Sequence, residues 1–174
     1  MRKLLLLLSC TLVLMSGCTK SNIVSPDGPV EPDFNIKDNV ELDMEQMQDV
    51  LDEQFVQTED YPFGQAIEFY IDEKDTSLYL MITVDDDTDP EAAAAYGMEI
   101  IDAFNDEAAT QDFSYEPSSD DSYGGFSDNY HVWIQIMPES TKEDETTWLV
   151  DDNIPAGTNY MVEPREAVTA ENQE

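Results

Sequence analysis

The sequence predicts an α+β fold, a two-layer sandwich in which an antiparallel sheet of four to six strands packs against two helices lying mainly on one face. The order of the predicted elements leads to this fold class. Apolar residues recur first with a helical period and then with the alternation of strands, and this change occurs twice along the chain. No internal repeat is visible, so we expect a single domain over residues 42–163.

The first helix is predicted to begin after Asp43, whose side chain can cap the free backbone N–H groups of the first turn. Gln46 stands three residues later, as in a capping box. Apolar residues then form one stripe on a helix that ends near Val56: Met44, Met47, Leu51 and Phe55. This stripe must pack on another element.

Two alternating stretches follow and predict a β-hairpin closed by residues 73–76. Their apolar members occupy every second position: Ile67, Phe69 and Ile71, then Leu78, Leu80, Ile82 and Val84. Successive side chains of a strand point to opposite faces of the sheet. We therefore expect the apolar set to face the helices and the residues between them to face the other way.

Asp89 as the cap and Pro90 as the first residue predict the start of the second helix, which is expected to end near Ala109. Glu91 lies in the first turn, where a negative charge suits the helix dipole. The face predicted to be buried combines small and large apolar residues: Ala93, Gly97, Ile100, Ile101, Phe104 and Ala108. Gly97 would let this helix approach the sheet closely.

The second half of the chain is predicted to add strands at residues 113–116, 130–137, 148–150 and 159–162. Between the last two, the run from Ile154 to Gly157 resembles a turn of β-rich surface proteins from Gram-positive bacteria. This resemblance implies a turn that leads into a strand. Residues 164–174 are expected to form a disordered tail.

The charge of the chain is strongly negative, with 40 Asp and Glu residues against 7 Lys and Arg residues and a formal charge of −33. Such a surface repels phosphate, which excludes nucleic acid as a partner. The chain is nevertheless 41% hydrophobic and 10% aromatic, too apolar for a fully disordered acidic polypeptide. We therefore expect a packed core behind the charge.

The N-terminus has the features of an export signal, because Arg2 and Lys3 precede an apolar stretch too short to span a bilayer permanently. The run from Leu14 to Cys18 resembles the lipobox of bacterial lipoproteins, with Met15 where Leu is commonest. The resemblance implies that residues 1–17 are removed as a signal peptide. It also implies that Cys18 carries a diacylglyceryl group, with a further acyl chain such as palmitate on its amine.

A lipid-anchored extracytoplasmic protein of the bacterial cell membrane is therefore expected, with residues 18–41 as a flexible tether containing three prolines. The alternative for the tether is an extended arm packed on the domain. Removal of the signal peptide also removes Cys10 and leaves no cysteine except Cys18. This excludes disulfides, thiolate zinc sites and cysteine nucleophiles from the mature domain, and no cofactor is expected.

The acidic residues give only weak candidates for a metal site. Asp85, Asp87 and Asp89 resemble the start of a calcium loop. Pro90, however, stands where that loop needs Gly, and Tyr96 stands where it needs a bidentate Glu. A solvated turn and a helix cap are favoured over a specific site.

No catalytic motif is present, and the only histidine, His131, lies in an expected strand. A non-catalytic binding or assembly module of the cell envelope is favoured. The alternative is an envelope hydrolase that uses acidic residues.

The sharpest functional hypothesis concerns the sheet face that the helices leave uncovered. Alternation places Tyr70, Tyr79 and Trp133 on that face, and exposed aromatic residues of this kind are typical of recognition sites. The loop containing Tyr123 and Phe126 is expected to form a rim. An envelope protein or a glycan is the expected partner. The alternatives are that the tether, the C-terminal strands or a second subunit covers the face.

Overall fold

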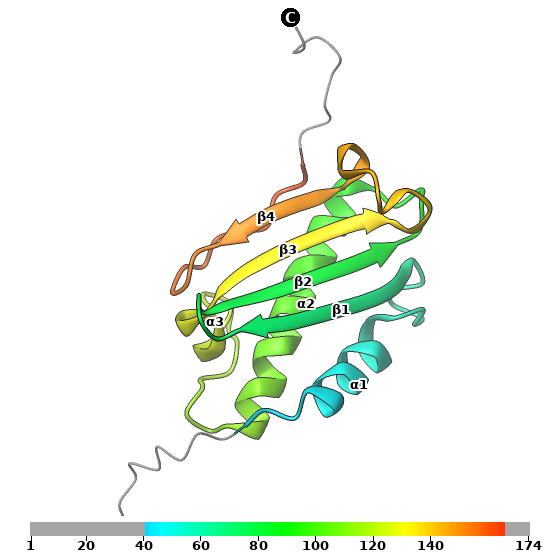
Figure 1. The fold of residues 1–174 in the computed structure, drawn as a ribbon. Coiled ribbons are helices and arrows are strands. Elements are labelled where there is room, and N and C mark those ends of the chain that lie inside the picture. The colour runs from blue at the N-terminus through cyan, green and yellow to red at the C-terminus, as the bar shows by residue number, and fades with distance from the viewer. Residues whose placement is uncertain (1–40, 166–174) are drawn as a thin grey trace, which may run out of the picture. The chain divides into compact units, whose positions relative to one another are not determined.

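Two helices cover one face of a four-stranded sheet, whose other face carries no α-helix in the part of the chain that the structure describes (Figure 1). The structure is a computed structural model that describes residues 41–165. The helices are α1 (Met44–Phe55) and α2 (Pro90–Gln111). The sheet order is β1-β2-β3-β4, formed by Gly64–Asp72, Ser77–Val84, His131–Pro138 and Val150–Ile154. The predicted α+β sandwich is confirmed.

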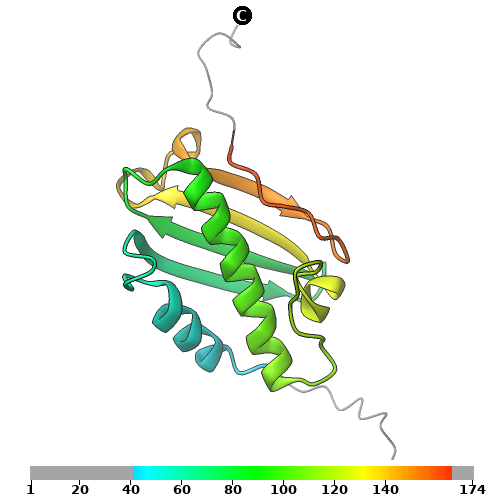
Figure 2. The ribbon, with the colours of Figure 1, turned by 180° about the vertical axis from the view of Figure 1, so that it is seen from behind.

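The pairing of the strands differs from the expected pattern at one place. The β1-β2 and β3-β4 pairs are antiparallel, whereas β2 and β3 are parallel, with Leu80 opposite Ile134. The reason is that α2 carries the chain back along the sheet between these two strands, as Figure 2 shows from behind. A strand that follows such a crossover enters beside its neighbour in the same direction.

Both predicted helix starts are confirmed by their hydrogen bonds. Asp43 Oδ1 accepts the backbone N–H groups of Glu45 and Gln46 at 3.1 Å each. Asp89 Oδ1 does the same for Glu91 at 3.0 Å and Ala92 at 3.2 Å. These bonds satisfy donors that a helix N-terminus otherwise leaves free, so the two helices begin at fixed residues.

The core lies between α2 and the middle of the sheet. Gly97 of α2 faces β3 so closely that an added Cβ would lie 2.7 Å from Ile134 Cδ1 and 2.9 Å from Ile136 Cδ1. The Tyr96 hydroxyl, which is buried, donates to Phe55 O at 2.8 Å and joins α2 to the end of α1. The apolar faces predicted for both helices and for the hairpin are therefore confirmed as the source of the core, except for Met44 of α1, which is 39% exposed.

The connection after α2 is not the strand expected at residues 113–116. It forms turns, and Phe113 is 91% exposed. A short helix that was not expected, α3 (Gly125–Asn129), precedes β3. The strand predicted at residues 130–137 is confirmed as β3 (His131–Pro138), which begins and ends one residue later.

The C-terminal strands are also placed differently. The strand expected at residues 148–150 is β4, which begins at Val150, after the short 3₁₀ helices η1 (Glu139–Thr141) and η2 (Glu145–Thr147). The turn is present, with Gly157 at φ +71°, but it follows a strand instead of leading into one. Residues 159–165 run along the outer edge of β4 without forming a strand (Figure 2), and Arg165 N donates to Leu149 O at 2.7 Å.

Asn105 explains the unexpected path of the chain before β3. This buried side chain donates to Glu116 O at 3.0 Å and accepts the N–H groups of Phe126 at 2.8 Å and Ser127 at 3.4 Å. Gly124, at φ +101°, packs on it without room for a Cβ. The side chain of Asn105 in α2 therefore holds the loop. Its Oδ1 also accepts backbone N–H groups of the first turn of α3.

No helix among residues 41–165 is long and apolar enough to cross a membrane. The expected signal peptide, the lipidated Cys18 and the tether up to residue 40 lie outside the described residues. The tail from residue 166 onward lies outside them as well.

We expect Asn105→Ala to lower the free energy of unfolding by about 2 kcal/mol, because it leaves buried backbone groups of the loop without partners. The measurement is urea denaturation of residues 41–165 and of the variant. Asn159→Ala, at an exposed asparagine, is the control and should change stability by less than about 0.5 kcal/mol. Equal effects of the two substitutions would contradict the role given to Asn105.

Candidate functional site

Three aromatic side chains lie side by side across the uncovered face of the sheet. Tyr70 is paired with Tyr79, and Tyr79 with Trp133, in the register of β1, β2 and β3. The ring centroids are 4.5 Å and 6.1 Å apart, and each pair of ring planes differs by 7°. Tyr70 is 49% and Trp133 is 42% exposed. We call these three residues the aromatic ladder.

The ladder is fixed by its neighbours as well as by its own stacking. Cross-strand aromatic pairs stabilise a sheet by up to about 1 kcal/mol each, which restricts their rotamers. The Tyr79 hydroxyl donates to Asp75 Oδ2 at 3.2 Å. Desolvation and the Asp75 carboxylate raise the pKa of Tyr79, so this hydroxyl stays protonated at neutral pH. The face therefore presents a preorganised aromatic strip.

A hollow of about 380 Å³ continues the same face next to the ladder. Its floor is formed by the two following rungs of the sheet, and its wall comes from the connection between β3 and β4. The nine lining residues are Ala66, Glu68, Met81, Thr83, Gln135, Met137, Lys142, Glu143 and Trp148. Trp148 Nε1 donates to Lys142 O at 2.9 Å, which holds the wall together. We call this feature the methionine hollow.

The charges around the methionine hollow are unequal. Lys142 Nζ lies 3.0 Å from Glu139 Oε1, and this hydrogen bond raises the pKa of Lys142 and lowers the pKa of Glu139. It is the only ion pair within residues 41–165. Glu68 and Glu143 also line the hollow, and the charge of Lys142 acts on both, but neither forms an ion pair of its own within residues 41–165. Anions should be repelled there and cations attracted.

The expected rim residues are not on this face. Tyr123 and Phe126 are only 6% and 1% exposed. The Tyr123 hydroxyl donates to Tyr160 O at 2.8 Å, and the Phe126 ring stacks on Tyr130 with centroids 4.3 Å apart. The prediction that they form an exposed rim of this face is wrong, because Asn105 holds their loop against the core.

The acidic residues after β2, which were the weak candidates for a metal site, mainly form hydrogen bonds with neighbouring residues of the domain. Asp85 Oδ1 accepts Gln65 Nε2 at 2.6 Å, Asp89 caps α2, and Asp87 is exposed. Residues 41–165 contain no cluster of three or more His, Cys, Asp or Glu side chains placed to hold a metal ion. His131 is exposed on β3, where its Nδ1 accepts Ala156 N at 3.4 Å.

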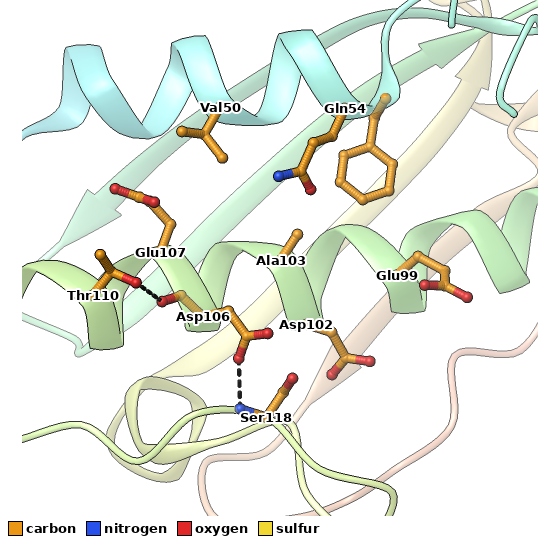
Figure 3. Close-up of a pocket in the computed structure, with 10 residues that line it drawn as sticks. Val50, Gln54, Glu99, Asp102, Ala103, Asp106, Glu107, Thr110 and Ser118 are labelled. Atoms are coloured by element: carbon orange, nitrogen blue, oxygen red, sulfur yellow. Dashed lines mark hydrogen bonds between the residues drawn. The ribbon is translucent and has the colours of Figure 1, made fainter. Parts of the chain in front are cut away.

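A second hollow, which we call the acidic groove, lies between α1 and α2 (Figure 3). Glu99, Asp102 and Asp106 line it from one stripe of α2, and Val50 and Gln54 line it from α1. Burial, followed by the charges of Asp106 and Glu99, raises the pKa of Asp102 to about 6. Asp106 Oδ1 accepts Ser118 N at 2.6 Å.

The sequence analysis did not predict this groove. The available signal was the spacing of Glu99, Asp102 and Asp106 by three and four residues, which places them on one face of a helix. Such a stripe is hidden among 40 acidic residues. The groove offers one carboxyl group that can exchange a proton near neutral pH.

No protein-family model, curated protein or solved structure matches this chain. The two surfaces are therefore interpreted from their own geometry.

We expect Asp102→Asn to stabilise the protein at pH 7 by about 1 kcal/mol, a value reduced for the partial exposure of this side chain. A folded pKa of about 6 against an ordinary value of 3.8 means that the folded state holds its proton more tightly. The stability due to this group is present below pH 4 and is lost as pH rises to about 6. Thermal denaturation at pH 4 and pH 7 measures the effect.

Asp87→Asn is the control, because it removes the same charge at an exposed position of the loop before α2. It should raise the stability at pH 7 by less than Asp102→Asn does. If both substitutions stabilise equally at pH 7, the gain reflects net charge alone and the unusual Asp102 environment is refuted.

Proposed function

We propose that this chain is a lipid-anchored extracytoplasmic lipoprotein that acts as a non-catalytic binding or assembly module of the bacterial cell envelope. Its recognition surface is the uncovered sheet face that carries the aromatic ladder and the methionine hollow. The single observation that carries the proposal is the ladder, three large aromatic side chains held in register with two of them more than 40% exposed.

The ladder supports binding because its exposure is unfavourable unless another molecule covers it. Contiguous exposed aromatic surface is uncommon on a soluble domain and marks sites of association. Tyr and Trp contribute large contact areas with little loss of conformational freedom, and stacking has already restricted these side chains. Binding therefore orders little that is not already ordered.

The charge of the chain fits an anchored rather than a membrane-adsorbed domain. Anionic lipid headgroups repel a surface of this sign, so acyl chains at Cys18 would have to supply the attachment. A flexible tether of residues 18–41 would reach roughly 25 to 30 Å on average. At that distance from the bilayer the sheet face is accessible to other envelope components.

An envelope hydrolase is the second candidate, and one observation favours it. Asp102, with its pKa raised to about 6, has the protonation behaviour of a general acid, and Asp106 lies in the same groove. Asp106, however, already holds the backbone of Ser118 through a short hydrogen bond. This engagement favours a structural use of the pair, so binding at the sheet face is the better-supported function.

Trp133→Ala should weaken the binding of envelope partners by roughly tenfold or more, the effect of removing a central aromatic residue from an interface. The measurement is quantitative recovery of partners from detergent-solubilised membranes with the full-length lipoprotein as bait. Phe113→Ala is the matched control, because Phe113 is exposed in the connection after α2, away from this face. If the recovered amounts do not differ between these variants, the sheet face is not the recognition surface.

Cys18→Ser should release the protein from the membrane fraction, because it removes the thiol that would accept the diacylglyceryl group. Fractionation of cells that express either form measures the change, and mass spectrometry of the intact wild-type protein measures the lipid. A wild-type protein with an unmodified Cys18 thiol would refute the anchor and leave the binding face untouched.

A further inference from the structure

We propose that the methionine hollow binds the side chain of an arginine or a lysine that belongs to an extended, basic segment of a protein partner. The inference rests on the proposed function, because it assigns the chemistry of the ligand to the same face. Three properties of the hollow lead to it: the nature of its floor, the charges on its rim and its position beside the aromatic ladder.

The floor of the hollow suits a long aliphatic stem. Met81 of β2 and Met137 of β3 both line it, and their rungs are adjacent in the parallel register. Methionine thioethers are flexible and polarisable, so they adapt to an unbranched chain. Trp148 adds an aromatic wall. Arginine and lysine side chains bury their methylene stems against such surfaces while keeping the charged end at the rim, and a guanidinium also stacks well on an indole.

The rim of the hollow suits a positive charge. Glu68 lines it from β1, and Glu143 lines it from the connection between β3 and β4. Lys142, which lines the hollow, is bonded to Glu139 at 3.0 Å, and its charge also acts on Glu68 and Glu143. Gln135 is also engaged, because its Nε2 donates to Asp151 Oδ1 at 3.2 Å. Three carboxylates, those of Glu68, Glu139 and Glu143, therefore share one ammonium group, and a cation that enters the hollow meets a net negative charge.

The ladder favours an extended peptide over a sugar. Tyr70 and Tyr79 are stacked with centroids 4.5 Å apart, a separation too short for two rings that lie side by side in one plane. Each ring therefore covers one face of the other, and those inner faces are closed to a pyranose ring. Tyr79 and Met81 are two residues apart on the same face, about 7 Å, which equals the spacing of alternate side chains in an extended peptide.

A second copy of this chain is a poor occupant of the face. The two copies would bring the same carboxylates together, and each full-length chain carries a formal charge of −33. Like charges placed opposite each other at an interface are unfavourable by several kcal/mol. The charge of the hollow is instead complementary to a basic protein segment.

Isothermal titration calorimetry tests the inference with the full-length protein in detergent and the blocked peptide Ser-Arg-Thr-Arg-Ser as the probe. The same peptide with citrulline in place of arginine keeps the shape and removes the charge. We expect the citrulline peptide to bind roughly tenfold more weakly or worse. Equal affinities for the two peptides would overturn the inference.

The protein side is tested with the double substitution Glu68→Gln and Glu143→Gln, which removes the rim carboxylates and keeps their volume. Its matched control is Glu53→Gln with Glu59→Gln, which changes the net charge equally at exposed positions in and after α1. We expect roughly tenfold weaker binding of the arginine peptide to the rim variant and little change for the control. An equal loss in both would show long-range attraction alone and overturn the inference.

The failure of this inference can be distinguished from the failure of the proposed function. If cell-wall glycan fragments bind in a manner that depends on Trp133 while the arginine peptide does not bind, the basic ligand is refuted and the recognition face is retained. If Trp133→Ala changes the binding of no partner, the proposal that this face is the recognition surface is refuted. Circular dichroism and urea denaturation of each variant exclude unfolding as the cause of lost binding.

Discussion

The close contact of α2 with β3 at Gly97 is the constraint on which both faces of the sheet depend. It fixes Ile134 and Ile136 toward the helices, and their neighbours in the strand must then face the other way. Trp133 is on the open face because Ile134 is in the core, and the same relation holds for Tyr79 and Leu80 in β2. The position of the aromatic ladder is therefore a consequence of core packing.

The edges of the sheet are less available than its face. On the β1 side, Gln48 of α1 donates from Nε2 to the backbone carbonyl of Ile67 at 2.8 Å. On the β4 side, the chain returns along the strand and Arg165 N donates to Leu149 O. Edge strands that are covered in this way resist pairing with another chain. Strand addition at these edges is disfavoured, so the proposed recognition would use side chains on the open face.

The features that were predictable from the sequence are those that depend on near neighbours. Asp43 and Asp89 cap helices through residues two and three positions away, and the hairpin follows from alternation alone. The parallel β2-β3 pair and the burial of Phe126 depend instead on Asn105 and the path of α2, which act over more than 20 residues. The ladder was predictable because alternation is local. The hollow was not, because its wall comes from a connection without periodicity.

In the proposed binding mode, the charge of the whole chain and the charges of the hollow act at different stages. At about 0.1 M salt the Debye length is roughly 10 Å, so distant carboxylates attract a cation during encounter but contribute little once it is bound. Carboxylates within the contact, such as Glu68 and Glu143, mainly determine how slowly the partner leaves. An acidic surface alone would give fast and unselective encounters. In the proposed mode, selectivity would therefore come from the two methionines of the floor, the carboxylates around Lys142 and the aromatic ladder.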